Sequence, residues 1–512
     1  MMSAGSIDRA RRLPFWAVAA LLMAVAYLLY ANTFGASWNF DDFPVIVDNP
    51  DVRSWTAFWQ NLRPGRPMRE LTYLLDRALF GMQPAGWHLQ QIFWHGLNAV
   101  LLFRLAAVLG AARLVALAAA LLFLVHPLQV EVVANLSHRK DSLLLAMALL
   151  SLLAYRQLLA AANGRERLLW GAATMVAAGG AWLAKENALM LPGLWVAMEL
   201  TCVPADQRLL ARHPRLLAGL AGLTTAVALI WALFWGNTAY QVGMQGLLGL
   251  RIGLTEAPTL GLYLLMLLKS WAFLWLRLVW PFDLALEYTY PPPASLFDPW
   301  VLGALAVVGL AAWWQWRCAQ RAPLAAFGLL WCAILWLPVS NLWPLTYLAA
   351  DRYLYAPLAG FCLIVAVVLA SLARRYGNAP AIALLAVTVV CLSLLTWQQN
   401  RVWATPFSLW SQAVRVSPEA SYALNNLGYQ YLERGEFAAA KELFERALRN
   451  PYNPNPHDNL GWILEKEGDL SGAISHYRQF IRAAELQAQP HYRDRALFLR
   501  RYLQQKYGAR VD

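Results

Sequence analysis

The sequence predicts an all-α fold: a polytopic bundle of about eleven membrane-spanning helices, followed by a C-terminal solenoid of helical repeats. Of the 512 residues, 59% are hydrophobic and only 14% are charged, a composition that a single soluble globule does not have. Apolar runs of ~17–25 residues, the length that crosses a bilayer, recur as far as residue 397. After about Arg401 the composition becomes polar and charged. We therefore expect a membrane domain at 1–400 and a second domain at 401–512.

The apolar runs give the candidate spans. They are roughly 13–31, 88–110, 111–126, 141–161, 168–184, 187–203, 216–236, 258–281, 299–316, 323–340, 355–373 and 379–397. The first run follows Asp8-Arg9-Ala10-Arg11-Arg12, and it is too long for a removed signal peptide and lacks a small-residue cleavage site. It predicts a signal anchor.

Cationic loops set the expected orientation, because Lys and Arg gather on the cytoplasmic side of a membrane. With the N-terminus in the cytoplasm, the other cytoplasmic cations are Arg165, Arg167, Arg208, Arg212, Arg215, Arg317, Arg321, Arg374 and Arg375. We expect an integral protein of a bacterial inner membrane. Its first outer loop, about 32–87, and its C-terminal repeats then face the periplasm.

One apolar run does not fit a simple span. The run at 258–281 contains Lys269 and Arg277, which are costly in a lipid-facing helix and natural in a helix that lies along headgroups. We expect this run to lie at the outer surface or to re-enter the membrane. The alternative is a pair of short spans within 237–281. Both choices place the C-terminus outside the cytoplasm.

Charge and cysteine content exclude some partners and cofactors. The net charge of +12 comes from cations in short loops beside the membrane, so we expect no nucleic-acid partner. The five cysteines lie in or next to apolar runs without metal-ligand spacing. No dedicated metal cluster is visible, so no cofactor is predicted, and metal dependence stays open.

The polar end carries an internal repeat. Asn426-Leu427-Gly428-Tyr429 is repeated as Asn459-Leu460-Gly461-Trp462, and Gly435, Ala440 and Phe444 match Gly468, Ala473 and Tyr477 at the same spacing. This is the tetratricopeptide (TPR) pattern, in which small residues lie where two helices touch. The segment 407–414 predicts the second helix of a preceding repeat, and 489–507 a capping helix. The array predicts a groove for a peptide or partner protein, with a spacer or dimer contact as the alternative.

Adjacent acids stand shortly after the first apolar run, in Trp38-Asn39-Phe40-Asp41-Asp42-Phe43. Two carboxylates at headgroup level repel each other, so their presence indicates chemistry. The alternative is a solvated loop in which Asp42 begins a turn or caps a helix.

Most of the other unusual polar residues fall on the same, outer side of the predicted topology. Acids and bases gathered at one membrane face predict a site, because scattered charges would lack partners there. These residues are Arg66 and Pro67, His126 and Pro127, Glu131, Asn135, His138, Arg139, Lys140, Asp141, Lys185, Glu186, Asn187, Asp351, Arg352 and Tyr353.

Each of these elements also has a structural interpretation. Arg139-Lys140 resembles a stop-transfer flank, and Lys185-Glu186 is also consistent with a neutralising ion pair between two spans. His126 before Pro127 is typical of a helix terminus with a hydrogen-bonded imidazole. Asp351-Arg352 is also consistent with a local pair.

The order of these motifs along the chain resembles the GT-C membrane glycosyltransferases. It is most similar to the transmembrane and TPR-repeat-containing O-mannosyltransferases and their bacterial relatives, and the resemblance covers nearly the whole chain. The motifs that carry it are Asp41-Asp42, Arg66-Pro67, Trp87-His88 with His95 and Asn98, His126-Pro127-Leu128-Gln129-Val130-Glu131, Arg139-Lys140-Asp141, Lys185-Glu186, and Ser340-Asn341 through Asp351-Arg352-Tyr353-Leu354-Tyr355.

The resemblance implies a polyprenyl-phosphate-linked sugar donor and a protein or peptide acceptor on the outer face, with the TPR repeats presenting the acceptor. It implies that an acid of the first outer loop is the base, and the matching position is Asp41. The chain departs from the family in two ways. Relatives often carry Gly-Arg-Ala-Asp where this chain has Ser137-His138-Arg139-Lys140-Asp141, and the TPR array here is short. The sugar, the lipid length and the acceptor are therefore left open.

This chemistry needs a base near the attacking hydroxyl and cations on the departing phosphate. We expect Asp41 to be the base and Asp42 to orient it or the sugar. The candidates for the phosphate are Arg139, Lys140, Lys185 and Arg352. The supporting residues are Arg66, His126, Glu131, Glu186 and Asp351.

Two other functions use the same sequence features. A non-catalytic protein that binds or transports lipid-linked glycans would need the cations without Asp41. A scaffold would use the TPR end to recruit an assembly partner. The acid pair in the first loop favours the enzyme over both.

Overall fold

The computed structural model describes residues 14–60, 66–209, 219, 222, 260–342, 345, 347–485 and 490–508. Throughout these residues the regular structure is helical and no strand occurs, as the composition predicted. Two compact units are present. The first comprises the described residues of Met1–Thr224, Gly309–Leu337 and Arg352–Thr405, and the second those of Thr225–Val308, Pro338–Asp351 and Pro406–Asp512.

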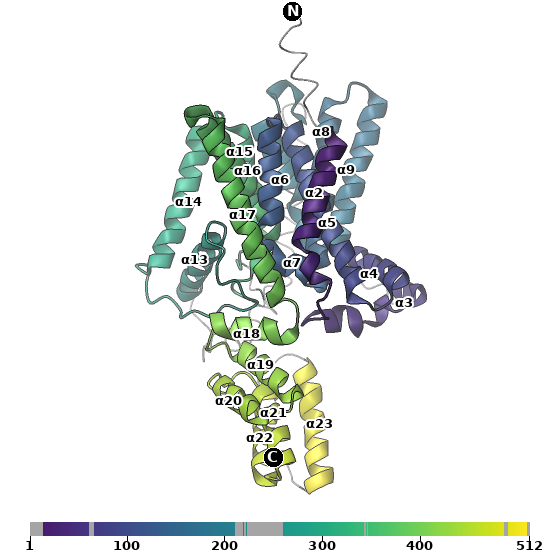
Figure 1. The fold of residues 1–512 in the computed structure, drawn as a ribbon, viewed down its shortest axis with the longest axis vertical. Helices are drawn as coiled ribbons and strands as arrows, with labels where there is room; N and C mark the ends of the chain where they lie inside the picture. Colours follow the sequence, from purple (N-terminus) through teal and green to yellow (C-terminus); the bar gives the residue numbers. More distant parts are fainter. Residues whose placement is uncertain are drawn as a thin grey trace, which may run out of the picture. The chain divides into compact units, whose positions relative to one another are not determined.

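The first unit is a bundle of apolar helices in which α5 packs against α2, α6 and α8 (Figure 1). Its helices are α2 (Phe15–Leu29), α3 (Trp55–Gln60), α4 (Pro67–Phe80), α5 (Pro84–Val108), α6 (Arg113–Val125), α7 (Val130–Ala134), α8 (Arg139–Ala160), α9 (Gly164–Ala184), α10 (Leu191–Cys202), α15 (Pro323–Trp336), α16 (Tyr355–Tyr376) and α17 (Asn378–Val402). Short helical turns between them include η2 (Phe43–Val47), η5 (Leu136–His138), η6 (Glu186–Met190) and η9 (Asp351–Leu354). Helix α14 (Pro299–Cys318) belongs partly to each unit.

Helices α15 and α16 approach each other closely because each carries a glycine at their contact. A Cβ added to Gly360 would lie 2.5 Å from the carbonyl oxygen of Gly328, and one added to Gly328 would lie 2.6 Å from that of Gly360. Small residues allow such backbone contacts in membrane bundles, where packing rather than water exclusion holds helices together.

Five helices in the described part of the chain are long and apolar enough to cross a membrane, or six if the bent pair Arg113–Val125 and Pro127–Ala134 is one span. Phe15–Leu29 and Pro323–Val339 are shorter apolar helices. Helix α13 (Leu260–Arg277), in the run at 258–281, is not among these candidates. Apart from residues 219 and 222, the run at 216–236 lies outside the described residues. The chain is an integral membrane protein, and the count of about eleven spans stays a prediction.

The second unit contains α13 and the TPR helices. These are α18 (Pro406–Val416), α19 (Ser421–Glu433), α20 (Phe437–Ala447), α21 (Asn455–Glu467), α22 (Leu470–Glu485) and α23 (Pro490–Tyr507). Side chains of α18 bond to a preceding segment: Gln412 donates to the carbonyl of Leu284 at 3.0 Å, and Arg415 pairs with Asp283 at 3.0 Å.

The two repeats have the contacts that their matching residues predicted. A Cβ on Gly428 would lie 2.7 Å from the Phe444 ring, and one on Gly461 would lie 2.7 Å from the Tyr477 ring. Gly435 and Gly468 end the first helix of each pair at φ values of 76° and 88°, which favour glycine. The 33-residue repeat is therefore two stacked helix pairs.

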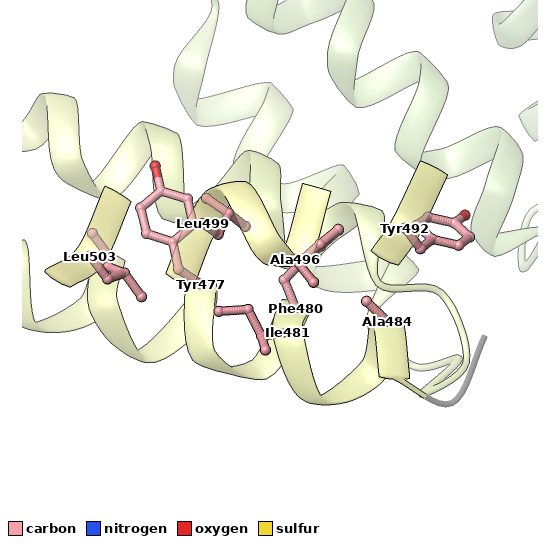
Figure 2. Close-up of a cluster of buried hydrophobic side chains, with 9 residues drawn as sticks. Tyr477, Phe480, Ile481, Ala484, Tyr492, Ala496, Leu499 and Leu503 are labelled. Atoms are coloured by element: carbon pink, nitrogen blue, oxygen red, sulfur yellow. The ribbon is translucent and has the colours of Figure 1, made fainter. Parts of the chain in front are cut away.

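Helix α23 closes the array. Its Tyr492, Ala496, Leu499 and Leu503 form one buried cluster with residues of α22 (Figure 2). Tyr502 and Tyr507 donate to the carboxylate of Glu465 at 2.5 and 2.7 Å, and Arg495 pairs with Asp458 at 2.8 Å. A terminal repeat needs such a cover over its apolar face, so α23 is the capping helix that was expected.

The α15–α16 contact predicts that Gly360→Ala destabilises the protein. The added methyl group forces two backbones apart, and overpacking of this kind costs about 1–3 kcal/mol. Gly303→Ala in α14 is the matched control, because its Cβ would meet nothing within 4 Å among the described residues. Thermal unfolding of both variants in detergent tests this; equal melting temperatures would contradict the close contact.

Candidate active site

The segment between α2 and α3 is attached to the bundle just before its two acids. The Asn39 side chain donates to the carbonyl of Trp403 at 2.6 Å, at the end of α17. Phe40 then adopts a positive φ of 41°, which is unusual for a bulky side chain. Strained backbone of this kind persists only where its surroundings hold it, and it is often found at functional sites.

Asp42 is a buried anchor. One of its carboxylate oxygens accepts the N–H of Asn39 at 3.1 Å, and the other accepts the N–H of Ser137 at 2.8 Å. Burial raises the pKa of Asp42 to about 7, and the N–H bonds from Asn39 and Ser137 act in the opposite direction. Since Ser137 lies in η5, this carboxylate joins the first loop to the turn that begins α8.

Asp41 differs from its neighbour in exposure. Its side chain is 40% exposed, and its Oδ2 lies 4.0 Å from Nε2 of the buried His138. An exposed carboxylate can meet an incoming hydroxyl, whereas Asp42 has both oxygens engaged by backbone. The adjacent acids therefore have different environments, as a base and its support would.

His138 lies between Asp41 and a second acid, Asp141. Its Nδ1 lies 3.6 Å from Oδ2 of Asp141, and Oδ1 of Asp141 accepts Nζ of Lys185 at 2.6 Å. Asp41, His138, Asp141 and Lys185 thus form a line of alternating acidic and basic groups. The side chains of His138 and Asp141 are at most 8% exposed.

Arg139, the next residue, is completely enclosed. It pairs with Asp76 of α4, and it donates to Gln90 at 2.6 Å, to Gln91 at 3.0 Å and to the carbonyl of Trp87 at 3.1 Å. Its guanidinium also lies 4.9 Å from the centre of the Tyr73 ring. These contacts join α4, α5 and α8.

Burial raises the pKa of Asp76 to about 6, while the charge of Arg139 and its hydrogen bond act in the opposite direction. Arg139 was expected among the phosphate-binding cations. Its contacts instead favour a role in holding the helices around the site.

Arg352 and Glu131 form a second buried pair. The Arg352 guanidinium binds the Glu131 carboxylate, which also accepts the Arg352 backbone N–H at 2.8 Å.

Asp351, in the second unit, accepts the hydroxyl of Tyr288 at 2.7 Å. His126 Nδ1 accepts the N–H of Leu128 at 3.3 Å, the helix-terminus role given above as the alternative to a site role.

The remaining cations lie near one another. Arg66 pairs with Glu186 at 3.0 Å, and the two side chains are 28% and 48% exposed. Lys140 interacts electrostatically with Arg66, Arg69, Asp141 and Lys185. Within the described ranges, no hydrogen bond or ion pair engages the Lys140 ammonium. Lys185 and Glu186 do not pair with each other; each binds a residue of another helix or loop.

Some residues of this site were not assigned from the sequence. Asp76, Gln90 and Gln91 surround Arg139, but they lie 63, 49 and 48 residues away from it, and no local pattern links them. His138 stood in the predicted run without a role. In the described residues, no group of three or more His, Cys, Asp and Glu side chains is placed to hold a metal ion.

Comparison with known proteins agrees with the sequence motifs. A protein O-mannosyl-transferase of Caenorhabditis elegans is 24% identical over 84% of this chain and 62% of its own length. The human protein O-mannosyl-transferase TMTC3 is 24% identical over 86% of this chain and 52% of its own length. The chain resembles the protein O-mannosyl-transferases. It spans little more than half the length of these two relatives.

Two further comparisons concern parts of the chain or its shape. A tetratricopeptide repeat model matches residues 421–451, which cover α19 and α20. The Archaeoglobus fulgidus oligosaccharyltransferase covers 80% of this chain and 59% of its own length, at 14% identity and a TM-score of 0.41. This likeness is too low to assign a fold.

The enclosed Arg139 predicts that Asp76→Ala is strongly destabilising. Removal of one partner leaves an uncompensated buried guanidinium, which costs about 3–5 kcal/mol. The control is Glu419→Ala, which breaks an exposed pair with Arg449 worth at most about 1 kcal/mol. Denaturant titration of the two variants in detergent measures the difference. Similar unfolding midpoints would show that Arg139 does not depend on Asp76.

Proposed function

We propose that the chain is an integral membrane glycosyltransferase that moves a sugar from a polyprenyl-phosphate-linked donor to a hydroxyl of a protein acceptor. The observation that carries the proposal is the half-exposed Asp41 next to His138, whose ring also lies near the cations Lys140 and Arg352, in a chain similar to protein O-mannosyl-transferases over 84% of its length. The transfer takes place on the outer face of a bacterial inner membrane, which the cationic loops and the first-loop position of Asp41 support.

Asp41 acts as the base. The acceptor oxygen forms a bond with the anomeric carbon of the sugar, and its proton passes to Oδ2 of Asp41. The bond between that carbon and the phosphate oxygen breaks, and its electron pair stays on the lipid phosphate. A positioned base of this kind is worth about 10²–10⁴ in rate. Asp42 holds the loop in place through its bond to the Ser137 N–H.

Lys140 is the principal cation for the donor phosphate. Lys185, Arg352 and Arg66 each bind a carboxylate already, whereas no such pair involves Lys140 in the described part of the chain. Arg66, Arg69 and Lys185 add positive potential around it. An anion beside Lys140 would offset the repulsion among these cations, so the cluster favours a phosphate.

The TPR repeats present the acceptor in this proposal. A protein that only binds lipid-linked glycans would share the cations and would not need Asp41, so substitution of Asp41 separates the two functions.

The base role predicts that Asp41→Asn lowers turnover by about 10²–10⁴-fold, because the amide keeps the size of the side chain and removes its basicity. The measurement is release of polyprenyl phosphate from polyprenyl-phosphate mannose in proteoliposomes, which registers transfer to any hydroxyl, water included. Asp48→Asn, an exposed acid of the same loop, is the control and should keep the wild-type rate. Normal turnover in a folded Asp41→Asn protein would reject this mechanism.

The phosphate role predicts that Lys140→Gln weakens binding of the same donor by about 10-fold or more, since a charge-assisted contact is lost. Lys140→Arg keeps the charge and should bind more tightly than the glutamine variant. Lys269→Gln is the control, because Lys269 belongs to the chain's second unit and pairs there with Asp298 at 3.0 Å. Equal donor affinity in wild type and Lys140→Gln would place the phosphate elsewhere.

A further inference from the structure

The imidazole of His138 is buried between two carboxylates without a hydrogen bond of normal length. It is 3% exposed, and neither ring nitrogen has a hydrogen-bond partner among the described residues. Nδ1 faces Asp141 at 3.6 Å and Nε2 faces Asp41 at 4.0 Å. A buried polar group without partners is costly, so its retention at this place needs an explanation.

The surroundings of the ring decide which nitrogen carries the proton. Asp141 is held as a carboxylate by Lys185, whose Nζ lies 2.6 Å away. A carboxylate only accepts hydrogen bonds, so Nδ1 is the nitrogen that donates toward Asp141. Nε2 then carries a lone pair and points it at Asp41. Two lone pairs do not attract each other, which is consistent with the 4.0 Å separation.

This arrangement changes when Asp41 takes up a proton. A protonated Asp41 has an O–H that can donate to the lone pair of Nε2. Contacts that are long in the absence of substrate often tighten during the reaction. The neutral ring would therefore stabilise protonated Asp41 and not ionised Asp41, which strengthens Asp41 as a base.

We propose that His138 is the positioning residue of Asp41: oriented by Asp141, it offers Nε2 to the proton that Asp41 removes from the acceptor. The inference rests on the proposed function. The proton leaves the acceptor hydroxyl for Oδ2 of Asp41, is shared with Nε2 of His138, and returns through the exposed Asp41 to water when the product departs. No bond of His138 is made or broken permanently.

Two variants test the inference in the full chain, with release of polyprenyl phosphate from polyprenyl-phosphate mannose as the readout. His138→Asn keeps a donor toward Asp141, and His138→Gln keeps an amide near Asp41; both lack the basic nitrogen. For both we expect kcat to fall about 10–100-fold with an unchanged KM for the donor. Two variants are made because either one can fail to fold.

The pH profile distinguishes this role from simple packing. The charged groups that face the ring are Asp41 from the loop, Lys140 and Asp141 from α8, and Arg352 from η9. If Nε2 stabilises protonated Asp41, its loss makes Asp41 ionise more readily, and the acid limb of the kcat profile moves to lower pH.

Different failures have different meanings. A wild-type protein that does not consume the donor rejects the proposed function, and with it this inference. Loss of turnover in Asp41→Asn together with wild-type kcat in the His138 variants rejects this inference and leaves the proposed function standing. A lower kcat with an unmoved acid limb also rejects it, because that result is typical of a packing defect.

Discussion

The enclosed guanidinium of Arg139 is the constraint on which the geometry of the site depends. A buried charge costs several kcal/mol unless it is paired and its remaining donors are bonded, and Asp76, Gln90, Gln91 and the Trp87 carbonyl meet that need together. Because these groups come from α4 and α5, the start of α8 can occupy only one position between them. His138 and Lys140 flank Arg139 in sequence, so the same constraint determines where both of them lie.

The first loop is attached to the turn before α8 by a hydrogen bond from a backbone N–H rather than by an ion pair. Asp42 binds the N–H of Ser137, one residue before His138, and so places Asp41 against the imidazole. Phe40, which has a positive φ, lies in the sequence between Asn39, whose side chain donates to Trp403, and the two acids. Adjacent carboxylates repel each other when both are ionised. Because Asp42 is buried and Asp41 is partly exposed, this repulsion is smaller than between two buried carboxylates. In the proposed mechanism Asp41 is therefore the reactive group and Asp42, which follows it, is the support, and exchange of their environments would not be neutral.

Sequence patterns predicted the parts of this structure that depend on near neighbours. The repeat at 33 residues predicted two helix pairs because Gly428 and Gly461 contact rings only 16 residues further along the chain. The acid pair marks the place of the proposed site, which stays a prediction. The partners of its cations could not be predicted in the same way: Lys185 stands beside Glu186, yet it binds Asp141, and Glu186 binds Arg66 across 120 residues. Those choices depend on how the helices cross, and periodicity carries no information about that.

Charge balance explains why such a site can exist before its substrate arrives. Glu131, Asp141 and Glu186 each neutralise one cation, so the free protein does not hold a large uncompensated charge at the membrane face. Lys140 makes no ion pair within the described residues, and the cations Arg66, Arg69 and Lys185 and the anion Asp141 act on it. A lipid phosphate that binds there needs no rearrangement of the existing pairs. In the proposed mechanism, a phosphate bound at Lys140 would bring the donor to the start of α8, where His138 also lies.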